Sequence, residues 1–317
     1  MTRTRGAYVL VAAGAGALIL PLFMRGFTLR FATDLYMYAC LACGWNLIGG
    51  LCGYGAFGNV AFLGLGAYTT AVLMSRAALP VLLTLPVAGA VAAAFAALFG
   101  YPVLRLKGHY FAIATLGLAE VTREVVANLR FLGGGQGISL PLGGEGPAFF
   151  YYLMLGLLSV SVALTYGVLR SRVGYAFVAI REDEMAAEAA GVNTAAYKVL
   201  AFSLSAFLCG MAGGAYAYWM SYIEPPMVFD VAFSVTMLVM PMIGGAGTLW
   251  GPVLGAFILR SLTQVLWGEF LTLHLLLLGL VMIGVVLFLP RGLMQYLTGE
   301  RRLSWAAVME NISVHRV

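Results

Sequence analysis

The sequence predicts an all-α protein, a polytopic bundle of transmembrane helices, and three observations support this. Hydrophobic residues make up 62% of the 317 positions and charged residues only 10%, whereas ordinary soluble domains carry about 25% charged residues. The apolar residues form long runs, and the basic residues lie at the ends of those runs. Alternation with a period of two does not recur, so helices remain as the way to satisfy the backbone in lipid.

About ten of these runs are candidate membrane crossings, since a helix needs about 20 residues to span a bilayer. The first has flanking basic residues like a signal peptide, but its length favours an uncleaved first helix. The eighth and ninth are short enough to re-enter the membrane instead of crossing it. The runs lie at about 7–24, 31–48, 59–75, 80–104, 109–130, 148–169, 198–220, 227–243, 252–267 and 271–289.

The basic residues predict which side each end faces. If all ten runs cross and the N-terminus is cytoplasmic, twelve of the eighteen Lys and Arg lie inside and four lie outside. Cytoplasmic loops are enriched in Lys and Arg, so the expected topology is N-in and C-in. Arg123 and Arg260 fall within runs, and we expect Arg260 to pair with an acid.

The whole chain, 1–317, is expected to form a single transmembrane domain. Its longest polar segments include an extracytoplasmic loop at about 131–147 and a cytoplasmic loop at about 171–197. The net charge of +5 does not indicate a nucleic-acid partner, because the basic residues follow the run ends and not one surface. The expected surroundings are a lipid bilayer.

The cytoplasmic loop contains a charged segment, REDEMAAEAAGVN at 181–193, that favours one short helix. Acidic residues at its start suit the positive end of a helix dipole, and Gly191 is a suitable stop. The segment is either a solvated connection or a docking helix with a small alanine face. Its candidate docking residues are Glu182, Asp183, Glu184, Glu188, Ala189, Ala190 and Gly191.

Glycine-rich segments follow the second run and recur further on. GGLCGYGAFGNVAFLGLGAYTTAVL at 49–73 lacks the Lys followed by Ser or Thr of a nucleotide-binding P-loop. Such segments either pack helices tightly or line a narrow translocation path. The run at 109–130 carries Glu120, Arg123 and Glu124 on one helix face, as either an ion pair or part of the path. Candidate path residues are Gly64, Gly66, Tyr68, Thr115 and Glu120.

No catalytic or metal site is predicted. The three histidines are far apart in the sequence and have no metal-spaced companions. Cys40 and Cys43 form a CxxC, but within an apolar run they are interpreted as small packing residues. The chain is therefore expected not to be an enzyme.

Several segments together resemble one family. They are GYGAFGNVAFLGLGAY, LKGHYFAIATLGLAE, GGGQGI, VAIREDEMAAEAAGVNTAAYK, IGGAGTLWGPVLGA and LFLPRGL, between about Gly44 and Leu293. In this order they resemble the inner-membrane permeases of branched-chain amino-acid ABC importers, of the LivM type. The resemblance implies that Glu188, Ala189, Ala190 and Gly191 belong to a cytoplasmic coupling element that sits in a cleft of an ATPase subunit.

The resemblance also implies the partners and the place of action. These are two cytoplasmic ATP-binding subunits, which hold ATP and magnesium, a second related permease, and a periplasmic substrate-binding protein at the outer mouth. The chain itself would bind no cofactor and would lie in the bacterial inner membrane. It departs from the family pattern at Ala56–Asn59, AFGN, which leaves the substrate open. Alternatives are a permease for urea or short amides and, outside the family, an ion-coupled secondary transporter.

Overall fold

The computed structural model describes residues 26–141, 144–269 and 292–294, together with single residues at 16, 18, 20, 21 and 279. The first and last predicted runs, 7–24 and 271–289, lie outside the described residues apart from those single positions. The prediction that both chain ends face the cytoplasm therefore concerns residues outside the described ranges.

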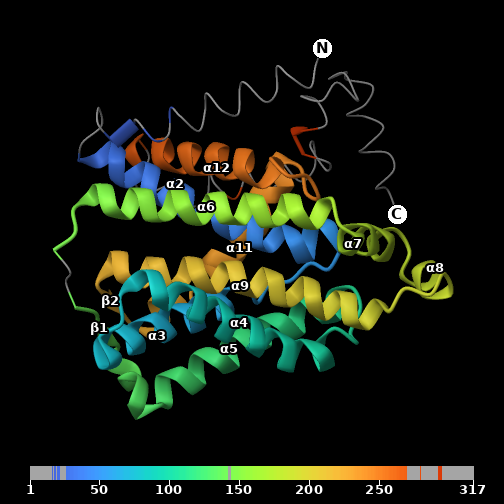
Figure 1. The fold of residues 1–317 in the computed structure, drawn as a ribbon, viewed down its shortest axis with the longest axis horizontal. Coiled ribbons are helices and arrows are strands. Elements are labelled where there is room, and N and C mark those ends of the chain that lie inside the picture. Colours follow the sequence, from blue (N-terminus) through green and yellow to red (C-terminus); the bar gives the residue numbers. More distant parts are fainter. Residues whose placement is uncertain are drawn as a thin grey trace.

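Long helices occupy all eight predicted runs that the structure describes, as Figure 1 shows. The prediction of a helical bundle is confirmed. The long helices are α2 (Phe27–Asn46), α3 (Val60–Ala77), α4 (Val81–Val103), α5 (His109–Asn128), α6 (Pro147–Leu169), α9 (Thr194–Met220), α11 (Val231–Gly244) and α12 (Gly251–Glu269).

Short elements connect the long helices and gather at two opposite ends of the bundle. The π-helix η1 (Leu47–Leu51) extends α2, and α7 (Arg172–Glu182) and α8 (Glu184–Ala189) link α6 to α9. At the other end, η2 (Arg130–Leu132), η3 (Gly134–Gln136) and β1 (Ile138–Ser139) follow α5, and β2 (Tyr222–Ile223) and α10 (Pro225–Val228) follow α9.

Glycines let the central helices approach closely. A Cβ on Gly66 of α3 would clash with the backbone of Gly210 on α9, and one on Gly213 would clash with the backbone of Leu63. Because only hydrogen fits at these positions, α3 and α9 pack backbone to backbone, as small residues allow in membrane bundles. The interpretation of the glycine-rich 49–73 segment as a packing element is confirmed for this helix pair.

The connections alternate between the two ends of the bundle. The predicted loop at 131–147 lies at the end opposite α8, where β1 pairs with β2 in antiparallel register, Ile138 opposite Ile223. The segments 52–59 and 104–108 lie instead at the α8 end, since residues in them bond to residues of α8 and α9. This alternation is what successive membrane crossings require.

Five helices among the described residues are long and apolar enough to cross a membrane. They are α3, α4, α6, α9 and the span Pro225–Gly244, and the shorter apolar helix Gly251–Leu266 follows them. The chain is thus a multi-pass membrane protein. About ten crossings remain a prediction, because two runs lie outside the described residues and α2 and α5 are more polar than these five.

Candidate coupling site at one end of the bundle

A break in the chain at Asp183 separates α7 from α8. Asp183 has an extended backbone, with φ −158° and ψ 110°, and its side chain accepts hydrogen bonds from the backbone N–H groups of Met185 and Ala186 at 2.9 and 3.0 Å. An acidic residue at this position satisfies the free amides of the first turn and suits the helix dipole. Residues 181–193 therefore form the end of one helix and a second short helix, where the sequence predicted a single one.

Gly191 ends α8, as the sequence predicted. Its φ is +87°, which an L side chain rarely adopts. The Gly191 N–H donates to the Glu188 carbonyl at 2.9 Å, and the Val192 N–H donates to the Ala187 carbonyl at 3.0 Å. A hydrogen bond across the last turn, together with a glycine in the left-handed conformation, is a common way for a helix to end. Both ends of this six-residue helix are thus fixed by local bonds.

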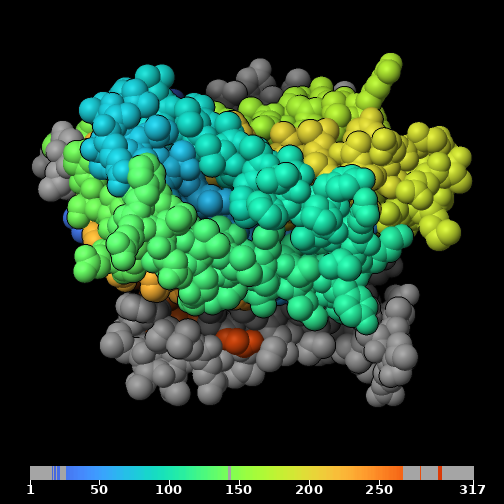
Figure 2. Space-filling view, turned by 90° about the horizontal axis from the view of Figure 1, so that it is seen from below, coloured from blue at the N-terminus to red at the C-terminus, as the bar shows by residue number. Residues whose placement is uncertain are grey.

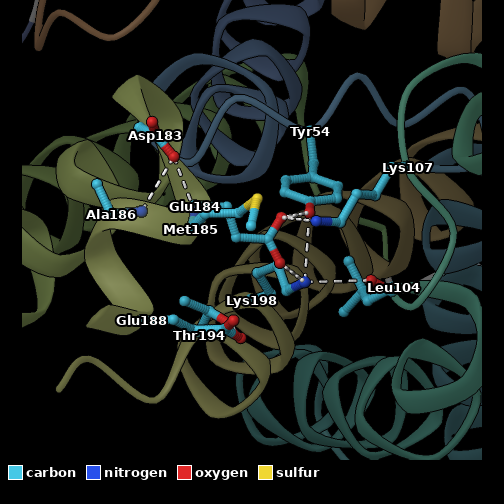
Figure 3. A network of polar contacts seen from close by, with 10 residues as sticks. All are labelled: Tyr54, Leu104, Lys107, Asp183, Glu184, Met185, Ala186, Glu188, Thr194 and Lys198. Carbon is cyan, nitrogen blue, oxygen red and sulfur yellow. Dashed lines mark hydrogen bonds and ion pairs between the residues drawn. The ribbon is translucent and has the colours of Figure 1, made fainter. Parts of the chain in front are cut away.

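Glu184, the first residue of α8, bonds to two other parts of the chain (Figure 3). Its carboxylate accepts hydrogen bonds from Lys198 Nζ at 2.8 Å and from the Tyr54 hydroxyl at 2.6 Å. Lys107 Nζ lies 3.5 Å from the same carboxylate. Lys198 also donates to the carbonyl of Leu104 at 3.3 Å. We call Tyr54, Lys107, Glu184 and Lys198 the α8 cluster.

The α8 cluster is well shielded and electrostatically balanced. The side chains of Lys198 and Glu184 are only 7% and 17% exposed. Burial alone would raise the pKa of Glu184, but the hydrogen bonds from Lys198 and Tyr54 and the charges of Lys198 and Lys107 hold it below its ordinary value. Burial and the neighbouring Glu184 carboxylate raise the pKa of Tyr54, which therefore stays a hydroxyl donor.

Arg181, at the end of α7, makes a second connection to the bundle. Its Nη1 donates to the Gly50 carbonyl in η1 at 3.1 Å, while its Nη2 lies 2.7 Å from Glu182. Asn46, just before η1, holds the turn after α11 by bonds to Gly247 and Thr248 at 2.8 and 3.0 Å. Single-turn π-helices such as η1 are frequent at functional sites. The α7–α8 corner is thus joined to the ends of α2 and α11.

The outer face of α8 is covered by no other described residue. Ala187 is buried against the bundle, whereas Met185 is 74% exposed. The alanines 186, 189 and 190 and Gly191 are exposed as well, so this face is slim and smooth. Glu188 is exposed but bonds Thr194 at 2.7 Å. In Figure 2 this yellow part of the chain projects from the bundle on the right.

The predicted docking residues therefore divide into two groups. Asp183 caps α8, Glu184 anchors it and Glu182 pairs with Arg181, so these acids hold the local fold. Residues 188–191 lie on the exposed side. The partners of Glu184, which are Tyr54, Lys107 and Lys198, were not predicted from the sequence, and neither was Arg181 as the partner of Glu182. The available signal was the basic charge of three of them, which had been used only to assign topology.

The predicted path residues do not share one surface in this single chain. Gly64 and Tyr68 of α3 both contact Phe229, and Gly66 packs on α9. Thr115 is buried and accepts a hydrogen bond from the Phe57 N–H at 3.1 Å, whereas Glu120 is 51% exposed and pairs with Arg123. Within the described residues the buried Tyr68 hydroxyl has no hydrogen-bond partner, and such unpaired groups are uncommon in folded proteins.

Within the described residues, no group of three His, Cys, Asp or Glu side chains could hold a metal ion. The four cysteines are buried and free. Cys40 of the CxxC contacts Ser161 of α6 at 2.9 Å, which is an interhelical packing contact.

Comparison with known proteins gives the family of the chain. The family described as branched-chain amino acid transport system, permease component, matches residues 27–286. The high-affinity branched-chain amino acid transport system permease protein LivM of Escherichia coli is 32% identical over 316 residues, 90% of this chain and 74% of the relative. LivM of Salmonella typhimurium is 32% identical over 86% of this chain and 71% of the relative.

More distant relatives extend the comparison. The autoinducer 2 import system permease protein LsrC of Klebsiella pneumoniae is 31% identical over 60% of this chain and 58% of its own length. No solved structure matches the chain. The family match and the two LivM relatives confirm the resemblance seen in the sequence, and they confirm a transport subunit and not an enzyme. The chain belongs to the family of branched-chain amino acid transport system permease components.

Proposed function

We propose that this chain is one permease of an ATP-driven importer for branched-chain or similar hydrophobic amino acids in a bacterial inner membrane. Its partners are two cytoplasmic ATPase subunits, a second related permease and a periplasmic substrate-binding protein. The names of the LivM relatives support the substrate class and the importer. ATP and magnesium belong to the ATPase subunits, and this chain binds no cofactor.

The observation that carries the proposal is the combination of an exposed outer face and a fixed inner face in α8. The alanine face and Gly191 offer a partner a slim helix end to enclose. The inner face is joined through Glu184 to Tyr54 and Lys198. A push on the outer face therefore reaches the ends of α3 and α9 as a rigid-body shift, the usual form of such coupling.

The proposed topology has about ten crossings with both chain ends in the cytoplasm. The distribution of Lys and Arg supports it. The α8 end is then cytoplasmic, and the β1–β2 end is extracytoplasmic. Loop 131–147 is the part of this chain that meets the binding protein, and its pairing with β2 gives that loop a defined shape.

The proposed path runs along the exposed face of α5 that carries Glu120. Glu120 is exposed on α5, a helix between two membrane surfaces. Charges at such depth usually face water or protein instead of lipid. This α5 face therefore lines a water-filled path shared with the second permease. A permease for urea or short amides, the alternative, would have the same architecture. So would a permease for autoinducer 2, the substrate in the name of the LsrC relatives.

Copurification from the native membrane tests the proposal. We expect two ATPase subunits and a second permease to accompany the chain. Ala189→Trp adds bulk to the outer face of α8 without touching the α8 cluster, so the ATPases should be lost while the second permease stays. Leu98→Trp, at a position that is 69% exposed on α4, is the matched control and should keep every partner.

Two results would contradict the proposal. If no ATPase accompanies the wild-type chain in membranes kept intact, the importer assignment fails, and ion coupling through Glu120, Arg123 and Glu124 becomes the alternative. If ATPases remain on Ala189→Trp, the importer assignment stands, but α8 is not their docking helix. Uptake of radiolabelled leucine and urea by the purified complex then distinguishes the two substrate classes.

A further inference from the structure

An ion pair joins α2 to α12 inside the bundle. Arg260 Nε donates to Asp34 Oδ2 at 2.8 Å, and Arg260 Nη2 contacts the same oxygen. Asp34 lies about 10 Å along α2 from its first residue, and Arg260 lies about 13 Å along α12, so both are well inside their helices. The expectation that Arg260 pairs with an acid is thus confirmed. The two side chains are 21% and 23% exposed.

Helix packing alone gives no reason to keep this pair. Charged residues at membrane depth are costly and usually mark a substrate or ion pathway. Replacing a buried pair by uncharged residues of similar volume is often neutral or stabilising. The pair therefore suggests a role beyond holding the helices together.

Aromatic rings from three helices lie beside the pair. The Arg260 guanidinium carbon lies 4.2 Å from the centre of the Tyr38 ring. The Tyr38 ring stacks on Phe233 of α11 at 5.8 Å, and Tyr216 of α9 meets Phe233 edge-on at 5.7 Å. Two opposite charges thus adjoin a largely apolar wall. This combination matches a zwitterion with an apolar side chain, such as a branched-chain amino acid.

We infer that Asp34 and Arg260 form a transient binding site for the α-ammonium and α-carboxylate groups of an amino acid during translocation. The ammonium group pairs with Asp34, the carboxylate with the two-pronged guanidinium of Arg260, and the substrate side chain lies against Tyr38 and Phe233. The inference rests on the proposed function and adds to it where on this chain the amino acid is held.

Replacing the Asp34–Arg260 contact by contacts with a zwitterion leaves the net charge of the site unchanged. Without substrate, each charge neutralises the other. With substrate, each charge meets its counterpart on the zwitterion, so the net charge of the site stays zero in both states. An uncharged substrate such as urea gains nothing from opening the pair, and a singly charged substrate leaves one group unpaired at depth, which is unfavourable. The pair would therefore select for zwitterions.

The test uses the complete importer, with its ATPases, second permease and binding protein, reconstituted in vesicles. The variant Asp34→Asn with Arg260→Gln removes both charges together and leaves neither partner buried as an unpaired ion, so it is expected to assemble. Uptake of labelled leucine should fall about tenfold or more, since two charge-assisted contacts are lost. ATP hydrolysis stimulated by the loaded binding protein should persist, so that leucine imported per ATP falls.

Tyr36→Phe is the matched control. It removes an interhelical hydroxyl contact with Tyr151, 3.0 Å long, from the same helix α2, and it should leave uptake at the wild-type level. Wild-type leucine uptake in the double variant would overturn the inference, and so would failure to assemble, which would assign the pair to packing. If the wild-type importer itself takes up no leucine, the proposed substrate class has failed instead.

Discussion

The α8 cluster and the charged group on α5 contain similar residues, but their surroundings differ. Glu184 and Lys198 come from different helices, join two further segments and are 17% and 7% exposed. Glu120, Arg123 and Glu124, which we call the α5 cluster, belong to a single helix, and their side chains are 51%, 34% and 58% exposed. The α8 cluster fixes the position of a helix, whereas the α5 cluster bonds only within its own helix among the described residues.

The two clusters differ in whether other segments of this chain supply their partners. The described partners of the α8 cluster come from three other segments of this chain, so the inner face of α8 is held by the chain itself. The α5 cluster lies on the exposed side of α5, a helix that also carries large exposed apolar side chains such as Tyr110 and Ile113. Lipid does not solvate such charges well. In the proposed topology, this face of α5 therefore meets water or another subunit.

The largest expected effect is that of Lys198→Met. The change leaves the Glu184 carboxylate partly buried without its main partner, and breaking a buried pair from one side costs about 3–5 kcal/mol. Because Lys107 and Tyr54 remain, we expect the lower end of that range. The ATPase subunits should be lost on copurification, and leucine uptake should fall with them.

Two variants sharpen that result. Glu184→Gln combined with Lys198→Met removes both charges and should recover most of the ATPase copurification. Lys107→Met should have little effect, because the Lys107 side chain is 64% exposed and exposed pairs contribute about 0–1 kcal/mol. If Lys198→Met behaves like Lys107→Met, the α8 cluster does not hold the docking helix.

The second effect concerns Glu120→Leu. The Glu120–Arg123 pair is exposed, so its loss should change the stability of the chain by about 0–1 kcal/mol. Leucine uptake by the assembled importer should nevertheless fall severalfold, since the α5 face then presents an apolar side chain to the path. The melting temperature of the complex and the uptake rate are measured together. Unchanged uptake would mean that Glu120 lies outside the path.

A smaller effect on stability is expected when a glycine after α8 or a glycine on α5 is replaced by alanine. Gly191→Ala places a Cβ on a residue with φ +87°, and the left-handed conformation costs about 1–2 kcal/mol. Gly117 on α5 has no described atom within 4 Å of an added Cβ, so Gly117→Ala should be neutral or gain up to about 1 kcal/mol from helix propensity. Thermal denaturation compares the two variants. Destabilisation by Gly117→Ala in the full importer would indicate a subunit packed against α5.

Much of the fold could be predicted because a helix that crosses lipid requires a long run of apolar residues. Apolar runs gave the positions of the long helices, and the run at 31–48 lies over α2 and the start of η1. Gly191 could be predicted as a helix end because a left-handed terminus favours glycine. The long helices and the helix end at Gly191 depend on residues that are close in the sequence, so a local pattern predicts them.

The break at Asp183 and the anchoring role of Glu184 could not be predicted in this way. Residues 181–190 are nearly all helix formers, so local propensity favours one continuous helix. The four acids of the segment also look alike in the sequence. Only contacts with Tyr54 and Lys198, which lie 130 residues before Glu184 and 14 residues after it, single out Glu184. Tertiary contacts of this range leave no local pattern.

The pH dependence of the α8 cluster gives the smallest and last effect. The pKa of Glu184 lies below its ordinary value of 4.5. A group with a lowered pKa in the folded state stabilises that state above the ordinary value, and its contribution is lost as the pH falls through the folded value. Amide hydrogen exchange of residues 184–192, corrected for intrinsic rates, should therefore give constant protection from about pH 5 to 8 in the wild-type complex.

Lys198→Met should raise the pKa of Glu184. Burial, the largest influence on Glu184, raises its pKa, and this variant removes both the hydrogen bond and the charge of Lys198 that oppose it. The carboxyl group should then take up a proton at higher pH, so protection of residues 184–192 becomes pH-dependent within the range where the wild type is flat. If Glu184 did not help to hold α8 in place, the wild type and Lys198→Met would instead give the same flat profile.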